Sequence, residues 1–339
     1  MPVDNQVSDE EATALRTGCG GFLNRRDVLS VHGADAESYL QGQLSQDISA
    51  LSIGQCADTL LLEPDGKLCA LLRITRVDGS DFVLDTEAGF APKVEARLRK
   101  FLLRSKVEIS RLEWRCLSLR GADTESAAAG LLTALAEGGV TILPFEWNGW
   151  SGVDLLGPND LVLDPSSGGL PDGITLCGPD VVETCRIVSG IPAMGSELTE
   201  KTIAAEAGLV ERTVSFTKGC YTGQELVARL DARGSNVARR LVGVVGGTDP
   251  ASHPLTFAMT LHAGEAPPAA DPEAVGDAVA DKVVGTITSA AWSSELGAWV
   301  ALAYLHRSVE SPGPIRVRSG DGLGGWSPAR VAPLPLLAD

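Results

Sequence analysis

Apolar and polar residues alternate along most of the chain in patterns that predict a mixture of α-helices and β-strands. Residues 28–31 form a short run typical of a strand. An amphipathic helix is predicted to follow, in which Tyr39, Leu40, Gln43 and Leu44 recur at helical spacing. Two further apolar runs flank the turn Pro-Asp-Gly-Lys at residues 64–67, which predicts a β-hairpin. Residues 81–86 then predict another strand.

The pattern continues through the middle of the chain and changes near residue 238. Residues 90–103 and 125–139 predict helices, and residues 113–121 predict a strand. Beyond residue 238, short valine-rich runs separated by turns predict a small all-β barrel. Within this region residues 262–282 are rich in Pro, Ala and Asp, and they predict a long mobile loop.

These elements predict an α+β fold in two folded parts. We expect a flexible N-terminus over residues 1–19, an α+β body over residues 20–236 and a C-terminal β-barrel over residues 237–339. A chain of 339 residues with 44% hydrophobic residues has enough apolar material for such cores. Aromatic residues make up only 5%, so aliphatic side chains must fill most of the interior.

The net charge of the chain restricts the kinds of ligand and partner that it is expected to bind. With 28 basic and 44 acidic residues the formal net charge is −16, and such a surface repels phosphate backbones. We therefore expect no nonspecific binding of nucleic acid. A small anionic ligand would need a basic pocket inside this acidic protein.

The start of the chain and its cysteines predict a cytoplasmic protein. The first residues are polar and acidic and lack the features of a secretory signal, and no apolar run approaches the ~20 residues that span a membrane. The seven cysteines are scattered and form no CxxC pair, which argues against a metal site held by this chain alone. We expect reduced thiols, no membrane association and no metal ligands.

The stretch KGCYTGQE, which begins at Lys218, carries the strongest candidate chemistry. Its glycines allow positive φ and a close approach of the backbone to a ligand, and they flank Cys220. The ammonium of Lys218 would favour the thiolate form of Cys220. Tyr221 offers a stacking face, and Gln224 and Glu225 offer hydrogen-bonding groups for an amide-rich heterocycle.

The residues alone leave two interpretations of this stretch open. A lone cysteine is more often a small buried hydrophobic side chain than a nucleophile. The alternative is a working site, in which Arg229 and Arg233 downstream would hold anionic groups of a ligand. The four histidines are remote in sequence, which disfavours a thiol–imidazole pair of the protease type.

The other six cysteines have less reactive surroundings than Cys220. Cys19 lies between glycines near the segment expected to be flexible, and its exposure stays open. Five others lie in apolar runs or lack a cationic residue within two positions, and we expect them to be inert: Cys56, Cys69, Cys116, Cys177 and Cys185.

The stretch KGCYTGQELVAR resembles the signature of the YgfZ family of folate-binding proteins, which is related to the glycine-cleavage T protein, an aminomethyltransferase that uses tetrahydrofolate. Two other stretches agree. RIVSGIPAMGSEL is similar to the family's segment before the motif, and LSVHGADAESYLQGQLSQDI is similar to its amino-terminal region. The resemblance runs from about Gly21 to Leu336. It implies a pseudo-symmetric, T-protein-like folate-binding body with a central pocket, the motif at the rim of that pocket, and the carboxyl-terminal barrel.

The resemblance also implies a ligand, which is tetrahydrofolate or another reduced folate. Asp47 is one candidate for contact with it, although an aspartate at this place equally suits a helix or turn cap. The main candidates lie in the motif or in the segment before it: Lys218, Tyr221, Gln224, Glu225, Arg229 and Glu206.

The chain departs from the T protein at acidic catalytic positions. The stretch that matches the T protein's aspartate pair offers Cys69 and Ala70 instead, and Val188 stands where the T protein has a carboxylate. No evident group is left to manage proton transfer at an aminomethyl nitrogen, so we do not expect glycine cleavage.

What the resemblance implies instead is an accessory protein in the assembly or repair of iron–sulfur enzymes. Cys220 and Lys218 would be its catalytic residues, and iron–sulfur client or assembly proteins its transient partners. One cysteine is too few ligands to hold a cluster alone. Two alternatives stay open: a folate-dependent, aminomethyl-type one-carbon transferase with an unknown acceptor, and a module that keeps the pocket only for stability. Whether the protein is an enzyme is therefore undecided from the sequence.

Overall fold

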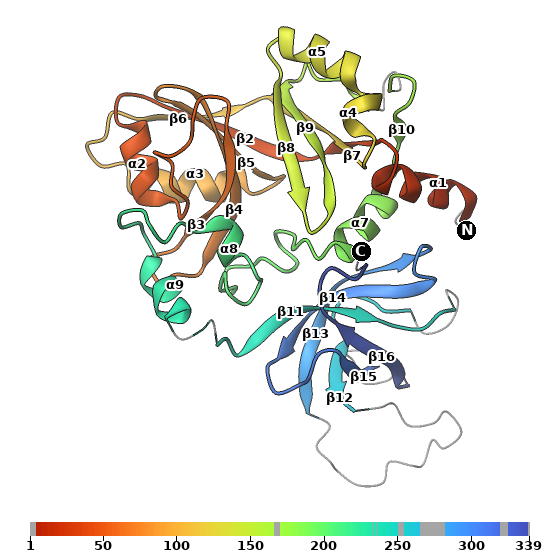
Figure 1. Ribbon diagram of the computed structural model, residues 1–339. Coiled ribbons are helices and arrows are strands. Elements are labelled where there is room, and N and C mark those ends of the chain that lie inside the picture. Colours follow the sequence, from red (N-terminus) through yellow and green to blue (C-terminus); the bar gives the residue numbers. More distant parts are fainter. Residues whose placement is uncertain are drawn as a thin grey trace.

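The computed structural model describes residues 5–165, 170–232, 234, 236–249, 254–264, 282–318 and 325–337. Within these residues the chain forms two five-stranded sheets and one closed barrel. The two sheets and the helices around them make up the body, and the barrel follows at the carboxyl end (Figure 1). This is the α+β fold with a carboxyl-terminal barrel that the sequence predicts.

The first sheet of the body has the strand order β3-β4-β5-β2-β6. Strands β3 and β4 form the hairpin predicted at the Pro-Asp-Gly-Lys turn. Leu40 of α2 (Ala36–Gln43) and Leu98 of α3 (Ala91–Arg99) are fully buried in one core with Leu29 and Leu60 of the sheet. The strands of this sheet are β2 (Arg26–His32), β3 (Cys56–Leu62), β4 (Leu68–Asp78), β5 (Asp81–Glu87) and β6 (Glu108–Leu112).

The second sheet has the strand order β10-β1-β7-β9-β8 and a core of its own. Leu117, Leu119 and Leu155 are completely buried in that core. Among the described residues, the helices of this half include α1 (Asn5–Arg16), α4 (Thr124–Ala127), α5 (Ala129–Glu137) and α7 (Pro179–Val188). The strands are β1 (Gly20–Asn24), β7 (Trp114–Arg120), β8 (Thr141–Trp147), β9 (Trp150–Pro158) and β10 (Thr175–Leu176).

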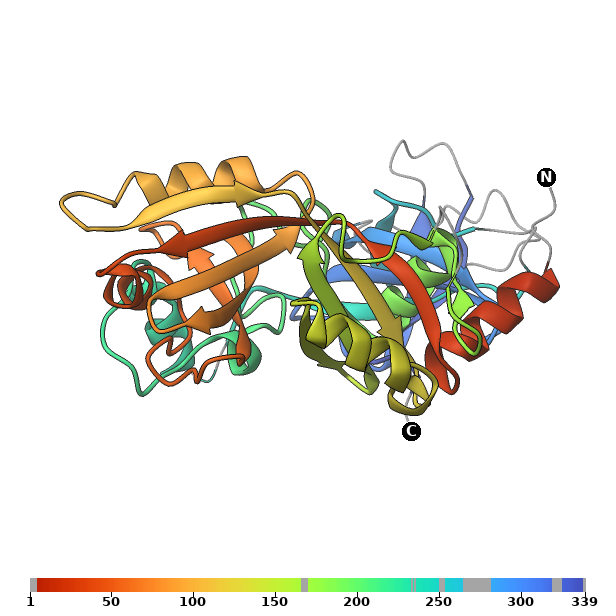
Figure 2. The ribbon, with the colours of Figure 1, turned by 90° about the horizontal axis from the view of Figure 1, so that it is seen from above.

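Two extended segments run through both sheets and join them. Strands β1 and β2 are separated by Arg25 alone, and strands β6 and β7 are separated by Glu113 alone. Figure 2 shows the two sheets side by side with these segments passing between them. Val28 of the first sheet and Leu156 of the second pack together where the sheets meet. Arg25 and Glu113, which separate the strands of these two segments, therefore lie at the junction between the two sheets.

Strands β11 to β16 close into the barrel in the order β11-β14-β13-β12-β15-β16. Alternate side chains such as Val244, Ile287 and Ala303 are completely buried inside it. Ile187 at the end of α7 packs against Leu302 on the outside of the barrel. The strands are β11 (Arg239–Val245), β12 (Thr260–Ala263), β13 (Val283–Ser293), β14 (Ala298–His306), β15 (Gly313–Arg318) and β16 (Ser327–Ala332).

Two short helices, α8 (Val210–Thr213) and α9 (Gln224–Asp231), lie between α7 and the barrel in the sequence (Figure 1). The KGCYTGQE motif runs into the first turn of α9. None of the helices in the described residues is long and apolar enough to cross a membrane.

The amino-terminal segment, expected to be flexible, forms helix α1 (Asn5–Arg16) instead. Leu15 is completely buried and lies in one cluster with Phe22 and Trp150. The indole nitrogen of Trp150 donates a hydrogen bond to the Leu15 carbonyl at 3.0 Å. The polar and acidic sequence of this segment does not indicate a packed helix, because the buried side chains that anchor α1, such as Leu15, lie in its last turn. Most of the predicted mobile loop, residues 265–281, lies outside the described residues.

Candidate functional site

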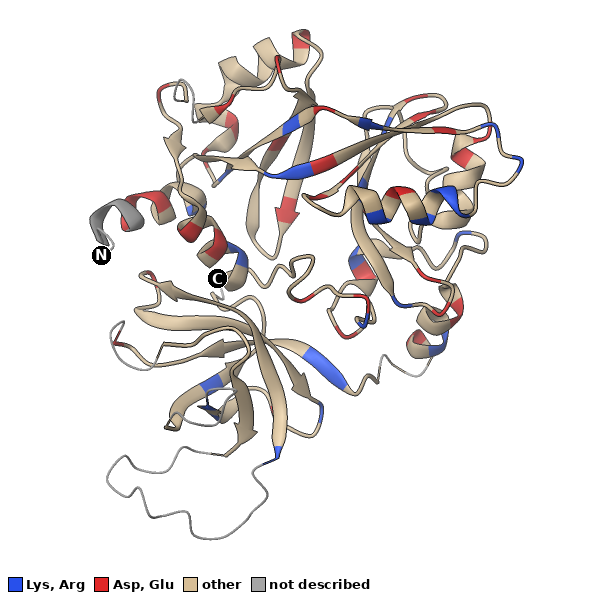
Figure 3. Ribbon diagram, turned by 180° about the vertical axis from the view of Figure 1, so that it is seen from behind, with Lys and Arg blue, Asp and Glu red and all other residues tan. Residues whose placement is uncertain are grey.

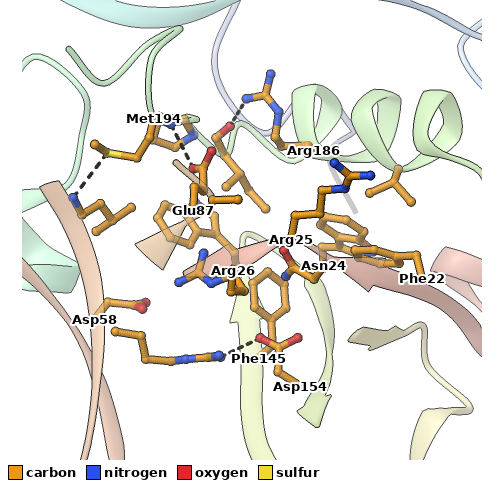
Figure 4. Close-up of a pocket in the computed structure, with 18 of the residues that line it drawn as sticks. Phe22, Asn24, Arg25, Arg26, Asp58, Glu87, Phe145, Asp154, Arg186 and Met194 are labelled. Carbon is orange, nitrogen blue, oxygen red and sulfur yellow. Dashed lines mark hydrogen bonds and ion pairs between the residues drawn. The ribbon is translucent and has the colours of Figure 1, made fainter. Parts of the chain in front are cut away.

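A central cavity of about 430 Å³ lies between the two sheets, helix α7 and the segment that follows it. Three aromatic side chains of the second sheet line one wall of the cavity. The rings of Phe22 and Trp150 are stacked with centroids 6.3 Å apart, and Phe145 meets Trp150 edge-on at 5.8 Å. Figure 4 shows Phe22 and Phe145 of this wall together with several charged side chains of the cavity.

The lining of the cavity is rich in charge and contains more arginines than carboxylates. The pairing among these groups decides which of them a ligand can use. The arginines are Arg25, Arg26, Arg73, Arg120 and Arg186. The carboxylates are Asp58, Glu87, Asp154 and Glu183.

A buried chain of ion pairs ties the two sheets together at this cavity. Arg26 and Arg73 both contact Asp85 of β5, at 2.6 and 2.9 Å. Arg73 also contacts Asp154 of β9 at 2.6 Å, and Asp154 contacts Arg120 at 2.7 Å. These three arginines and two carboxylates leave one net positive charge at the cavity wall.

This network is fixed in place and has few groups left for a ligand. Burial alone would raise the pKa of Asp154, but Arg120 and Arg73 hold it well below its usual range, helped by a hydrogen bond from Ser118. The Arg120 guanidinium lies over the ring of Phe145, with 3.7 Å from Cζ to the ring centroid. We conclude that the network serves as a structural wall.

Arg186 of α7 is also fully engaged. Its guanidinium donates to Glu183, to Glu197, to the Ile191 carbonyl and to the Ser289 hydroxyl. Ser289 belongs to barrel strand β13 and itself donates to the completely buried Glu197 at 2.7 Å. Arg186 therefore fixes the cavity wall to the barrel.

Arg25 differs from the other four arginines because it has no such partner. It is the single residue between β1 and β2, it is exposed, and in the part of the chain that the structure describes its guanidinium has no hydrogen bond or ion pair. Figure 4 shows its side chain extending from the strand crossing toward α7. Arg25 is thus a cation available to an anionic ligand.

Glu87 differs from the other carboxylates of the cavity in the same way, because it has no ion-pair partner among the described residues. Its Oε1 accepts a hydrogen bond from the Met194 backbone at 2.9 Å, and no further hydrogen bond or ion pair to it occurs within the described ranges. Burial raises the pKa of Glu87, and the bond from Met194 and the nearby Arg26 and Arg186 act in the opposite direction. By contrast, Asp58 is paired with Arg212 at 2.5 Å.

The KGCYTGQE motif lies away from this cavity. It packs against the end of α2 and the turn between β3 and β4, where a Cβ atom on Gly223 would come within 2.6 Å of the Glu63 carbonyl. No residue of the motif lines the central cavity. The structure therefore differs from the expectation that the motif sits on the rim of the pocket.

Lys218 has a different task from the predicted activation of Cys220. Its ammonium donates to the backbone carbonyls of Gln41, Leu44 and Gln46, at 2.8, 2.7 and 2.6 Å. Burial lowers the pKa of Lys218 to about 8. No hydrogen bond joins it to Cys220 among the described residues. The lysine thus anchors the motif to the end of α2.

Replacing Lys218 with methionine is expected to destabilise the protein by about 2–4 kcal/mol, because charged hydrogen bonds contribute ~1.5–3 kcal/mol each and three carbonyls lose their donor. Urea unfolding of the variant and wild type checks this. Arg229→Met, on the exposed surface of α9, is the control and should change the unfolding free energy by less than ~0.5 kcal/mol. Equal stability of Lys218→Met and wild type would contradict the anchoring role.

The other predicted contact residues are only partly brought together. Tyr221 is buried, and its ring centroid lies 5.3 Å from the Lys218 ammonium. Gln224 accepts a hydrogen bond from the Tyr221 backbone at 3.1 Å. Glu225 and Arg229 are exposed on α9, where Figure 3 shows both acidic and basic residues. Arg233 lies outside the described residues.

Two further candidates are engaged elsewhere in the body. Glu206 is buried and paired with Arg239 at the start of the barrel, at 3.0 Å. Asp47 accepts a hydrogen bond from the Gln41 side chain at 2.9 Å. Neither lines the central cavity.

The cysteines separate into three groups by exposure. Cys220 is exposed, Cys56 is partly buried and the other five are buried, including Cys19, which is 3% exposed. Burial raises the pKa of Cys69 to about 11 and that of Cys116 to about 12. Cys220 is therefore the thiol most open to a reagent or a partner.

Arg25 and Glu87 do not stand out as site residues in the amino-acid sequence. Both lie beside predicted strands, Arg25 in the run NRRD and Glu87 at the end of DFVLDTE. The sequence feature that could have indicated them is a charged residue inside or next to an apolar strand. The sequence pattern could not show that β2 and β5 meet at a cavity.

Comparison with known proteins agrees with this fold. Residues 3–153 match the GCVT N-terminal domain, and residues 239–337 match the glycine cleavage T-protein C-terminal barrel domain. The crystal structure of the glycine cleavage system aminomethyltransferase T from Bartonella henselae superposes with a TM-score of 0.76. That comparison covers 97% of this chain and 89% of the other at 20% sequence identity.

Relatives in sequence carry several names. An aminomethyltransferase of Rubrobacter xylanophilus is 28% identical over 99% of this chain and 88% of its own length. The tRNA-modifying protein YgfZ of Escherichia coli O157:H7 is 29% identical over 62% of this chain and 66% of its own length. An uncharacterised Haemophilus influenzae protein is 28% identical over 63% of this chain and 69% of its own length. The chain belongs to the superfamily that unites YgfZ proteins with the glycine-cleavage T protein.

Proposed function

We propose that the protein binds a reduced folate in its central cavity and acts as an accessory protein in the assembly or repair of iron–sulfur enzymes, using Cys220. The observation that carries the ligand assignment is the unpaired Arg25 beside an aromatic wall, inside a chain of net charge −16. The similarity to aminomethyltransferases and to YgfZ proteins supports the same ligand class.

The residues of the cavity fit the chemistry of a folate. Its flat heterocycle suits the ring faces of Phe22, Phe145 and Trp150, and its carboxylate tail suits the guanidinium of Arg25. The volume of about 430 Å³ is within the range of small-molecule sites. When bound, a reduced folate would supply a carrier for one-carbon units.

The position of Cys220 supports a role toward a partner protein. The thiol is exposed and lies outside the cavity, so it can meet the surface of another molecule. Within the described residues no group of three or more His, Cys, Asp or Glu side chains could hold a metal ion. Cys220 would therefore form a transient bond or share a cluster with a partner.

A one-carbon transferase is the second candidate, and Glu87 is the observation that favours it. This carboxylate lies in the cavity, and burial raises its pKa. It could take a proton from an acceptor amine, a task for which the sequence showed no group. Measurable turnover with a one-carbon folate and an acceptor would establish this alternative.

Isothermal titration with reduced folates tests the ligand assignment, and the activity of iron–sulfur enzymes in cells lacking the protein tests the accessory role. We expect binding at sub-millimolar concentration and a loss of client activity that the wild-type gene restores. Normal client activity in the deleted cells would contradict the accessory role and leave the ligand assignment to the titration.

A further inference from the structure

Two charged groups of the cavity have no ion-pair partner among the described residues, and they have opposite signs. Arg25 supplies a free guanidinium, and Glu87 supplies a carboxylate with spare acceptor capacity. In the β2–β5 register Arg26 is opposite Glu87, so Arg25 and Glu87 come from neighbouring backbone positions. Figure 4 shows their side chains diverging, that of Glu87 toward Met194 and that of Arg25 toward α7.

The surroundings of Glu87 preserve its acceptor capacity for a ligand. Arg186, which lines the same cavity, is occupied by Glu183, Glu197 and Ser289. Arg26 is occupied by Asp85 at 2.6 Å. The Met194 backbone uses one lone pair of Oε1, while a carboxylate has about four acceptor sites in total.

We infer that Glu87 is a specificity-determining residue, which accepts hydrogen bonds from adjacent ring N–H and exocyclic NH₂ groups of the bound heterocycle. Two adjacent donors of this kind can form two parallel hydrogen bonds to a carboxylate, as a guanidinium does. The class of ligand is then a 2-amino-4-oxo heterocycle, and Arg25 holds the anionic end of the same molecule. This inference rests on the proposed folate site and adds the residue that selects the heterocycle.

The test measures whether Glu87 and the 2-amino group of the ligand act together. Tetrahydrofolate and its 2-desamino-2-methyl analogue are titrated into wild type and Glu87→Gln by calorimetry. Wild type is expected to bind tetrahydrofolate about tenfold or more tighter than the analogue, since a hydrogen bond to a charged group contributes roughly this much. In Glu87→Gln the preference should fall to about twofold or less, because the coupling is lost.

Glu95→Gln is the matched control, since it removes the same charge from a surface position outside the cavity. It should keep the wild-type preference for the 2-amino ligand. Glu87→Ala, which removes the carboxylate altogether, serves as a second variant if Glu87→Gln does not fold. An undiminished preference in Glu87→Gln, or in Glu87→Ala where that variant is needed, would overturn the inference. Failure of tetrahydrofolate to bind wild type would instead overturn the proposed folate site itself.

Discussion

Replacing Asp154 with asparagine is expected to lower the free energy of unfolding by about 3–5 kcal/mol, the range for breaking a buried ion pair from one side. Asp154 is 3% exposed and contacts Arg73 and Arg120 at 2.6 and 2.7 Å. Without its charge, Arg120 keeps only neutral acceptors around a completely desolvated guanidinium. Since Arg73 and Asp154 belong to different sheets, the variant also loosens the junction that forms the cavity.

Urea unfolding of Asp154→Asn and wild type measures this effect. Glu95→Gln is the control, because Glu95 pairs with Arg99 and Arg111 at the surface, and its loss should change stability by less than ~1 kcal/mol. If Asp154→Asn costs no more than Glu95→Gln, the network does not hold the sheets together.

The same network predicts how stability depends on pH. The pKa of Asp154 is lowered in the folded protein by Arg120 and Arg73, against the effect of burial. Its ionised form therefore contributes stability that is present above the unfolded pKa of about 3.9 and is lost as pH falls below it. The difference in stability between wild type and Asp154→Asn should accordingly shrink as the pH falls below about 4. A difference that is constant from pH 7 to pH 3 would contradict this assignment.

Replacing Cys220 with serine is expected to abolish the accessory function while leaving the affinity for tetrahydrofolate within about twofold of wild type. The thiol is exposed and lies outside the cavity, so partner chemistry and ligand binding should separate. Complementation of client-enzyme activity in deleted cells measures the first, and calorimetry measures the second. The control is Cys56→Ser at the partly buried cysteine, which should complement fully.

Thiol labelling at neutral pH gives an independent reading of Cys220. It should react fastest, because burial shields the thiols of Cys69 and Cys116 and raises their pKa. A Cys220→Ser variant that supports normal client activity would make the cysteine dispensable, as expected of a module kept only for stability. Turnover that survives in this variant would point instead to the one-carbon transferase.

The local features of this fold were accessible from the sequence. The hairpin at the Pro-Asp-Gly-Lys turn and the valine-rich barrel could be predicted, because the residue pattern of a single strand or turn is enough to indicate each of these elements. Helix α1 was missed because its anchor is Leu15, whose burial depends on Trp150 far along the chain.

The site was harder to predict because it depends on contacts between distant strands. Arg25 and Glu87 become neighbours only when β2 pairs with β5, and Asp154 reaches Arg73 only when the sheets meet. The sequence indicated that Lys218 stands near Cys220, yet the ammonium is drawn to carbonyls more than 170 positions away. Proximity along the chain therefore could not show that these carbonyls engage the ammonium of Lys218.

The most direct test of the central claim is calorimetric titration of tetrahydrofolate into wild type and Arg25→Gln. The account predicts a dissociation constant below a millimolar for wild type and an affinity about tenfold weaker for Arg25→Gln, because the glutamine cannot pair with the ligand's carboxylates. Arg229→Gln, at an exposed arginine outside the cavity, should bind like wild type. No binding of any reduced folate by wild type, or equal binding by wild type and Arg25→Gln, would contradict the account.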